Sequence, residues 1–346
     1  MNEVELLDGL LRIYSPSQNE EEAVGYLVAQ MQEAGFDAFR DDAGNATGIL
    51  GHGSREFVLL SHIDTVAGFI EVRREGDRLH GRGAVDAKGP LCAFIGAAAR
   101  AGYREGWKII VIGAVEEEYP TSKGAHFAGT QYKPDFCIIG EPGGWDCLTM
   151  GYRGSLLFDY TLRKMTSHSA ALIQPPCEEA VTFWQRLKRY TLDVNSDKSR
   201  HFDQLQPVLL EMRSEADGFQ EGAMLRINVR LPLQTDIQKL KDKVKKLADG
   251  ADISFLAETA SFRADKNNDL VRAFLSAIRS SGGSPRFKLK TGTSDMNILG
   301  PIWNCPIVTY GPGDSRLDHT SSESIDLHDF KRSIAILTEV LEKLTQ

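Results

Sequence analysis

The pattern of hydrophobic and polar residues in the first 150 positions predicts an α/β fold. Short, almost continuous apolar runs, which are typical of strands buried on both faces, lie at 57–61, 107–115 and 135–140. Segments with the amphipathic or small-residue composition of helices lie at 3–35 and 90–102. Within 3–35, Ser17 or Asn19 is the candidate N-cap of a second helix. This alternation predicts a mostly parallel sheet that is covered by helices on both faces.

The pattern changes between residues 154 and 262. There the order is strand, helix, strand, strand, helix, strand, over 154–163, 178–192, 207–213, 224–231, 236–248 and 253–262. This order is typical of the ferredoxin-like α+β fold. Beyond residue 267 the α/β pattern returns and continues to a final helix at 329–344. We therefore expect one α/β domain formed by 1–153 and 263–346, with 154–262 inserted as a second domain.

The composition is that of an ordinary globular protein, with 42% hydrophobic and 25% charged residues in a chain of 346. No basic segment followed by an apolar run opens the chain, so we expect no signal peptide. No apolar stretch reaches the roughly 18 residues that span a bilayer, which excludes a membrane segment. The five cysteines form no Cys-x-x-Cys pair, which indicates a reducing compartment and hence a cytoplasmic protein.

The net charge of −8 makes nucleic acid an unsuitable partner. The inserted segment 154–262 carries 15 basic and 15 acidic residues, so the whole negative excess lies on the α/β domain. A cation site in that domain would use such an excess, and dispersed surface charge is the alternative explanation.

Chemistry-bearing residues follow directly after the predicted strands or lie in glycine-rich loops. They are His62, Asp86, Glu118, Glu141 and His319. The carboxyl ends of parallel strands form the edge of the sheet where α/β proteins bind ligands. Imidazole and carboxylate ligands suit zinc, cobalt or manganese. Five such ligands that share one carboxylate can hold two divalent metal ions about 3.5–4 Å apart.

Asp86 is the candidate shared ligand, because it lies among three glycines in the loop at 81–89. A dinucleotide-binding loop is excluded, since the third glycine of that motif would have to occupy position 86. Asp64 follows His62 by two residues on an extended segment, so it can orient His62 or a neighbouring ligand. The acids 116–118 repel one another unless a cation or a proton relieves them, and a solvated acidic loop is the alternative.

Seven motifs, spread over essentially the whole chain, resemble the di-zinc family of acetylornithine deacetylases, succinyl-diaminopimelate desuccinylases, aminoacylases and carboxypeptidase G. They are Ser-His-Ile-Asp-Thr (61–65), Gly-Arg-Gly-Ala-Val-Asp-Ala-Lys-Gly (81–89), Glu-Glu-Glu (116–118), Gly-Glu-Pro (140–142), Ser-His-Ser-Ala (167–170), Gly-Thr-Ser-Asp (292–295) and Asp-His-Thr (318–320). The resemblance implies a zinc-exopeptidase-like catalytic domain with an inserted lid and dimerisation domain.

The resemblance also assigns roles to the candidate ligands. It implies that Asp86 bridges two divalent metal ions, zinc first and cobalt or manganese as alternatives. His62 and Glu141 would complete one metal site, and Glu118 and His319 the other.

Asp64 would orient His62, and Glu117 would be the general base. The family has Asp-Glu-Glu where this chain has three glutamates, so Glu116 corresponds to the aspartate and not to the base.

The inserted domain carries further candidates. The resemblance implies a homodimer in which His168 reaches the active site of the partner subunit and stabilises the oxyanion. Lys-Met-Thr-Ser precedes this histidine where the family commonly has a glycine, which is a departure from the pattern. Asn228 and Arg230, two apart on a predicted strand, could bind a substrate carboxylate together with Thr293 and Ser294. Structural ion pairing is the alternative for this arginine.

Within the family, 290–297 and 311–320 look most like the carrier-protein-linked lysine hydrolases, which are similar to acetyl-lysine deacetylases. Those enzymes hydrolyse the amide at the α-nitrogen of lysine or ornithine, which releases it from the C-terminal glutamate of a carrier protein. We therefore expect an amidohydrolase of lysine or arginine biosynthesis whose substrate is a small acidic amino-group carrier protein. Asp295 is the candidate partner of the substrate's side-chain ammonium.

Three alternatives stay open at this point. The enzyme could be an N-acetylornithine or N-acetyl-lysine deacetylase, or a di- or tripeptidase. In another class, the chain could be a non-catalytic relative that serves as a dimeric binding module.

Overall fold

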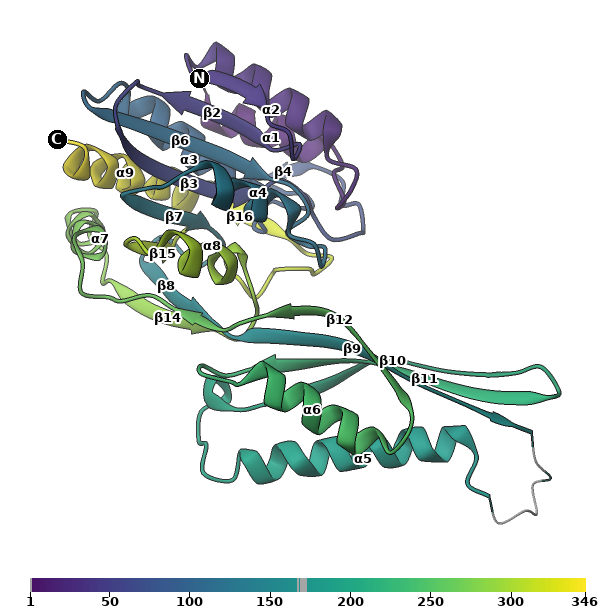
Figure 1. Cartoon of the computed structure of the whole chain (residues 1–346). Helices are drawn as coiled ribbons and strands as arrows, with labels where there is room; N and C mark the ends of the chain where they lie inside the picture. The colour runs from purple at the N-terminus through teal and green to yellow at the C-terminus, as the bar shows by residue number, and fades with distance from the viewer. Residues whose placement is uncertain (1, 167, 169–172) are drawn as a thin grey trace. The chain divides into compact units, whose positions relative to one another are not determined.

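The computed structural model describes residues 2–166, 168 and 173–346, which form two compact units (Figure 1). The first unit comprises Met1–Gly151, Ala264–Leu289 and Ser294–Gln346, and the second comprises Tyr152–Arg263 and Lys290–Thr293. The inserted segment thus belongs to the second unit, together with the short stretch 290–293, which the sequence-based boundaries placed in the first domain.

The first unit is built on a mixed sheet. Its strands follow the order β1 (Asp37–Arg40), β2 (Ala46–Leu50), β6 (Trp107–Ala114), β3 (Arg55–His62), β7 (Phe136–Gly140), β15 (Ile307–Thr309) and β8 (Cys147–Tyr152), and β14 (Arg286–Lys290) pairs with β8. The four central strands β6, β3, β7 and β15 are parallel to one another. The expected mostly parallel centre is therefore confirmed, with antiparallel strands such as β2 and β8 added outside it.

Helices cover both faces of this sheet. One face carries α1 (Glu3–Arg12), α2 (Glu21–Glu33), α3 (Lys88–Ala101), α7 (Asp269–Ser280) and α9 (Leu327–Leu344). The other face carries α4 (Lys123–Gln131) and α8 (Asp295–Trp303). Successive side chains of a strand point to opposite faces, so Phe57 and Leu59 join the core around α3, whereas Val58 and Leu60 are buried on the other side. This burial on both faces explains the continuous apolar runs of the central strands.

Several helices of the first unit begin at a residue whose side chain caps the first turn. Asn268, Asp326 and Ser294 each accept hydrogen bonds from backbone N–H groups in the first turns of α7, α9 and α8. Helix α8 had no counterpart among the expected elements, because the Gly300-Pro301 pair inside it is typical of a helix end.

A small antiparallel sheet, β16 (Ser324–Asp326), β5 (Arg78–His80) and β4 (Arg73–Glu75), joins two distant segments of the first unit. In it, His80 pairs with Ser324. The chain that leads into the glycine-rich loop 81–89 is therefore fixed beside the chain that follows His319.

The second unit consists of β9 (Gly154–Met165), α5 (Pro176–Val194), β10 (Gln206–Ala216), β11 (Gln220–Leu231), α6 (Ile237–Ala248) and β12 (Asp252–Thr259). The turn η1 (His201–Asp203) precedes β10, and β13 (Phe262–Arg263) ends this part of the chain. The strands form an antiparallel sheet in the order β10, β11, β9, β12, which is the ferredoxin-like arrangement that the sequence predicted. The ring of Phe183 on α5 stacks on Tyr160 of β9 at 4.6 Å.

Across the residues that the structure describes, every helix is too short or too polar to span a bilayer.

The packing of α9 on α3 generates a stability prediction. Phe330 of α9 is fully buried in the core of the first unit. Phe330→Ala should lower the free energy of unfolding by about 3–5 kcal/mol, because it removes a large side chain and leaves a cavity. The measurement is denaturant unfolding followed by circular dichroism, with the exposed neighbour Lys331→Ala as control. A loss below about 1 kcal/mol for Phe330→Ala would contradict this packing.

Candidate metal centre

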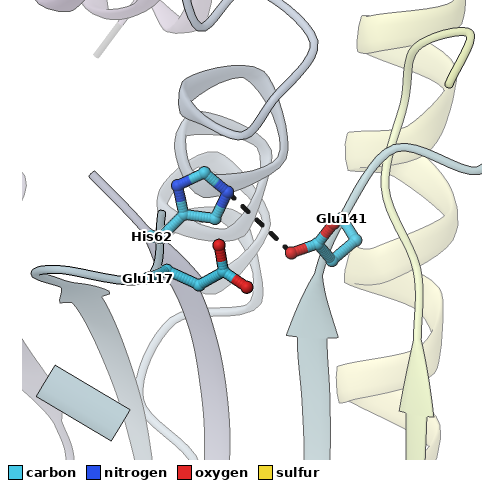
Figure 2. Close-up of side chains that lie close together, drawn as sticks. All are labelled: His62, Glu117 and Glu141. Carbon is cyan, nitrogen blue, oxygen red and sulfur yellow. Dashed lines mark ion pairs between the residues drawn. The ribbon is translucent and has the colours of Figure 1, made fainter. Parts of the chain in front are cut away.

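Three neighbouring parallel strands end at the same edge of the sheet. His62 is the last residue of β3, which lies between β6 and β7. Glu117 and Glu118 come soon after β6, and Glu141 comes directly after β7. Figure 2 shows the imidazole of His62 and the carboxylates of Glu117 and Glu141 pointing toward one another. The strand order has therefore brought together residues that are up to 79 positions apart in sequence.

Close approach of the backbone is needed just before Glu141. A Cβ atom on Gly140 would lie 2.5 Å from Cβ of Ser61 and 2.8 Å from the ring of Phe94. Glycine therefore lets β7, β3 and α3 meet at the strand ends.

His62 is almost fully buried, with 2% of its surface exposed. Its Nδ1 atom lies 2.9 Å from the backbone carbonyl oxygen of Asp64, to which it can donate a hydrogen bond. That bond leaves Nε2 free to act as a lone-pair donor on the other side of the ring. Nε2 lies 3.3 Å from Oδ1 of Asp86 and 3.8 Å from Oε1 of Glu141.

His319 faces the other oxygen of the same aspartate. Its Nε2 atom lies 3.0 Å from Oδ2 of Asp86 and 2.7 Å from Oε1 of Glu118. The carboxylates of Asp86 and Glu118 raise the pKa of His319 to about 10 because they stabilise its charged form. Asp86 thus presents one oxygen to each histidine.

Asp64 is fully buried and organises the neighbouring acids. Its carboxylate accepts hydrogen bonds from the backbone N–H groups of Glu117 at 3.1 Å and Glu118 at 3.0 Å. The hydroxyl of Ser17 donates a third, at 2.6 Å. The expected helix-capping role of Ser17 or Asn19 is therefore wrong: the N-cap of α2 is Glu20, and its side chain makes no capping hydrogen bond.

Backbone conformation, close packing and hydrogen bonds together fix the loop 81–89, which carries Asp86. Gly83 has a φ of +87°, which favours glycine, and a Cβ on Gly89 would lie 2.3 Å from the carbonyl oxygen of Ala84. The buried ammonium of Lys88 donates to two carbonyl oxygens near the end of α1, at 2.7 and 3.2 Å. Burial lowers the pKa of Lys88 to about 8.

Ionisation of the carboxyl groups at this edge is unfavourable, because they are partly or fully removed from water and repel one another. Burial raises the pKa of Glu117 well above its ordinary value; the imidazole of His62 opposes this shift, and the charge of Glu141 adds to it. Burial also raises the pKa of Asp295, at the start of α8, to about 7. Among the described residues, no hydrogen-bond donor reaches its buried Oδ1 atom. A positive charge at this place would relieve the repulsion.

The donor set fits divalent metal ions. Ligand atoms of His62, Glu117 and Glu141 lie within 4.8 Å of one another, and so do those of His62, Asp86 and Glu118. Neutral imidazole nitrogens and carboxylate oxygens are the ligands that zinc and related ions prefer. The five candidate ligands of the sequence thus lie close together: Asp86 contacts both histidines, Glu118 contacts His319, and Glu141 lies near His62.

Sequence reasoning did not identify the role of Glu323, which contacts the loop of Asp86, or that of Arg82, which belongs to this loop. Oε1 of Glu323 accepts hydrogen bonds from the backbone N–H groups of Val85 at 2.9 Å and Asp86 at 3.1 Å. Its Oε2 atom forms a 2.8 Å ion pair with the guanidinium of Arg82. A glutamate that follows Thr-Ser-Ser in a polar stretch is typical of a solvated loop, so no pattern in the sequence indicated this role.

The remaining candidates belong mainly to the second unit. His168 is exposed there, and its neighbours Ser167, Ser169 and Ala170 lie outside the described residues. Oδ1 of Asn228 accepts a 2.7 Å hydrogen bond from the hydroxyl of Ser155. Burial lowers the pKa of Arg230, which is partly buried two positions further along β11.

Thr293 is partly buried and closes the stretch 290–293 of the second unit. Ser294 begins the next segment of the first unit, where its hydroxyl caps α8 by accepting a hydrogen bond from Met296 N–H. The first unit by itself therefore contains all the candidate ligands, whereas His168, Asn228, Arg230 and Thr293 lie in the second.

Two known proteins of similar sequence are both named as hydrolases. The chain is 40% identical to a [LysW]-lysine hydrolase of Deinococcus radiodurans over 98% of this chain and 96% of the relative. It is 29% identical to a [LysW]-lysine/[LysW]-ornithine hydrolase of Sulfurisphaera tokodaii over 98% of this chain and 95% of the relative.

Solved structures with the same fold are also found. An M20 family metallo-carboxypeptidase of Sulfolobus solfataricus has a TM-score of 0.81 at 17% identity, with 99% of each chain covered. The dipeptidase Dug1p of Saccharomyces cerevisiae has a TM-score of 0.80 at 14% identity, covering 99% of this chain and 95% of the other.

A family model described as peptidase family M20/M25/M40 matches residues 58–343, a span that includes every candidate metal ligand. With a family match over most of its length and a relative 40% identical along almost all of it, the chain belongs to peptidase family M20/M25/M40, a family of metal-dependent hydrolases.

Proposed function

We propose that this enzyme hydrolyses the amide between the α-nitrogen of lysine or ornithine and the γ-carboxyl of a glutamate. That glutamate is the C-terminal residue of a small acidic amino-group carrier protein, and the reaction serves lysine or arginine biosynthesis. The substrate is supported by the names of full-length relatives up to 40% identical. The observation that carries the chemistry is the arrangement of Asp86, whose two carboxylate oxygens face two different histidines, with Glu117 nearby.

The chain would hold two divalent metal ions, with zinc as the expected ion and cobalt or manganese compatible with the same ligands. Asp86 would bridge them. One set of ligands would be completed by His62 and Glu141, and the other by Glu118 and His319. When bound, such ions polarise the scissile carbonyl group and make water more acidic.

Glu117 would move the protons of the reaction. Its carboxylate lies beside His62 and Glu141 (Figure 2), and its backbone N–H donates a hydrogen bond to the side chain of Asp64. It would take a proton from the attacking water and return it to the α-nitrogen as the carbon–nitrogen bond breaks. The products balance as a carboxylate on the carrier and a free amino group on the released amino acid.

The second unit would supply substrate contacts. No carboxylate of the described residues forms an ion pair with Arg230, which leaves its guanidinium available for a substrate carboxylate. Its backbone oxygen accepts a 3.1 Å hydrogen bond from Arg153, a buried side chain whose charge further favours an anion. Asn228 and Thr293 of the same unit would complete this site, and Ser294, in the first unit, stays a substrate-binding candidate from the sequence.

This unit would also act as the lid and dimerisation domain. His168, which is exposed and follows the last residue of β9 by three positions, would stabilise the oxyanion in the partner subunit of a homodimer. Asp295 would form an ion pair with the side-chain ammonium of the substrate.

The five cysteines are free thiols, which supports a reducing, cytoplasmic location.

A panel of substrates tests the assignment. The purified enzyme, loaded with zinc or cobalt, should release lysine or ornithine from the carrier conjugate with kcat/KM at least about tenfold above that for N-acetyl-lysine, N-acetylornithine or dipeptides. This margin corresponds to about 1.4 kcal/mol of extra transition-state binding by the carrier. Equal or better turnover of the acetylated amino acids would identify a free deacetylase instead. A chelator should abolish all of these activities.

Substitution at the bridging carboxylate tests the metal assignment. Asp86→Ala should lose both metal ions, because each depends on one of its two oxygens, whereas His62→Ala and His319→Ala should each mainly weaken one. The measurement is metal content by mass spectrometry after dialysis against a weak chelator. The exposed acid Asp77→Ala is the matched control and should keep both ions. Two tightly bound ions in Asp86→Ala would refute the bridge.

The general base has an internal control in the neighbouring glutamate. Glu117→Gln should lower kcat by about 10²–10⁴-fold, because the amide cannot accept the proton of water, while both metal ions stay bound. Glu116→Gln should stay within a few-fold of the wild type. Steady-state kinetics on the carrier conjugate, together with metal content, distinguish the two. Full activity of Glu117→Gln would rule out this mechanism.

A further inference from the structure

The ion pair between Arg82 and Glu323 lies next to the metal centre, and the proposed reaction gives it no role. It is buried, with 8% of Arg82 and 1% of Glu323 exposed, and its closest atoms are 2.8 Å apart. Both residues belong to the first unit, although 241 positions separate them in sequence. The pair therefore fixes two distant parts of the chain against each other.

Glu323 acts on the backbone of the bridging aspartate. One of its oxygens accepts from the N–H groups of Val85 and Asp86, so the carboxylate fixes the peptide that carries Asp86. The acceptor is charged, which makes such hydrogen bonds stronger than those between neutral groups.

Arg82 extends the contact to two further segments. Its guanidinium donates to the carbonyl oxygen of Thr320 at 3.1 Å, and Thr320 directly follows His319. Its Nε atom donates to the carbonyl oxygen of Gly68 at 2.9 Å, four residues beyond Asp64. One ion pair thus joins the loop of Asp86, the loop of His319 and the segment that follows His62.

Stability alone does not explain a buried pair of this kind. The desolvation of two charges offsets much of their attraction, and apolar side chains of similar volume commonly stabilise a fold as well or better. What apolar side chains cannot do is hold these four backbone groups, two N–H and two carbonyl, at defined positions by hydrogen bonds. Groups that hydrogen-bond to metal ligands or to their backbone orient those ligands and commonly change metal affinity 10–100-fold.

We propose that Arg82 and Glu323 form a positioning pair, which holds the loops of Asp86 and His319 at the separation that two metal ions require. The pair touches neither substrate nor reacting atoms and acts through the ligand loops. This inference rests on the metal centre of the proposed function and is independent of which amide the enzyme hydrolyses.

A double variant separates positioning from folding. Arg82→Met with Glu323→Leu replaces the pair by apolar side chains and so avoids an unpaired buried charge. The metal-free variant should unfold at a denaturant concentration close to that of the metal-free wild type. Its zinc affinity, measured without substrate by competition with a chromogenic chelator, should fall about 10–100-fold.

The control is an ion pair of the same unit that contacts none of these loops. Arg100 and Glu3 join α3 to α1 at 2.7 Å, and Arg100→Met with Glu3→Leu should leave zinc affinity unchanged. Wild-type zinc affinity in the Arg82/Glu323 double variant, or an equal loss in the control, would overturn the proposal.

A conservative variant keeps the test valid if the double variant does not fold. Glu323→Gln retains an oxygen that can accept from Asp86 N–H but loses the charge that pairs with Arg82. The zinc affinity of Glu323→Gln should lie between those of the wild type and the double variant. If the double variant does not fold, the zinc affinity of Glu323→Gln should be several-fold below that of the wild type. Unchanged affinity for both zinc ions would overturn the proposal. Because every readout uses zinc alone, an incorrect substrate assignment would leave these results unaffected.

Discussion

The parallel pairing of β6, β3 and β7 is the constraint on which the candidate metal centre depends. Neighbouring strands lie only about 4.8 Å apart, so residues that follow parallel strands at one edge come within reach of a common ion. His62, Glu118 and Glu141 are placed in this way, and β15 continues the parallel set toward the loop of His319. The helices that bury both faces of these strands hold their ends at fixed positions. The same layers that form the core therefore set the geometry of the site.

The acids at this edge repel one another, and they have different roles in the structure. Asp64 and Glu323 lie behind the candidate ligands and accept backbone N–H groups, so their negative charge serves to position the chain. Burial raises the pKa values of Glu117 and Asp295, and it also raises that of Glu323, where the backbone N–H groups of Val85 and Asp86 oppose the shift. A cation bound among the carboxylates of the site would reduce the repulsion between them.

The sequence revealed the parts of this arrangement that leave a periodic or compositional signal. Continuous apolar runs located the central strands, and the polar residues at their ends were therefore recognisable as a group around Asp86. Helix α8 was missed because Gly300-Pro301 indicates a helix end, although the fold accommodates the pair. The roles of Ser17 and Glu323 could not be read from sequence, because a hydroxyl or an acid in a polar stretch is typical of solvent exposure. Only the tertiary structure shows that both are directed toward the site.

The insertion of the second unit has a consequence for the order in which the protein matures during synthesis. The first unit is completed by its C-terminal segment, which supplies β15, His319, Glu323 and the helix α9 that packs on α3. A ribosome translates the insertion before any of these, so the nascent chain carries the acids from Asp86 to Glu141 without their partners. The autonomous core of the inserted unit can form earlier. The candidate metal centre is therefore among the last parts of the chain to be assembled, and a chain that ends before His319 lacks one of its ligands.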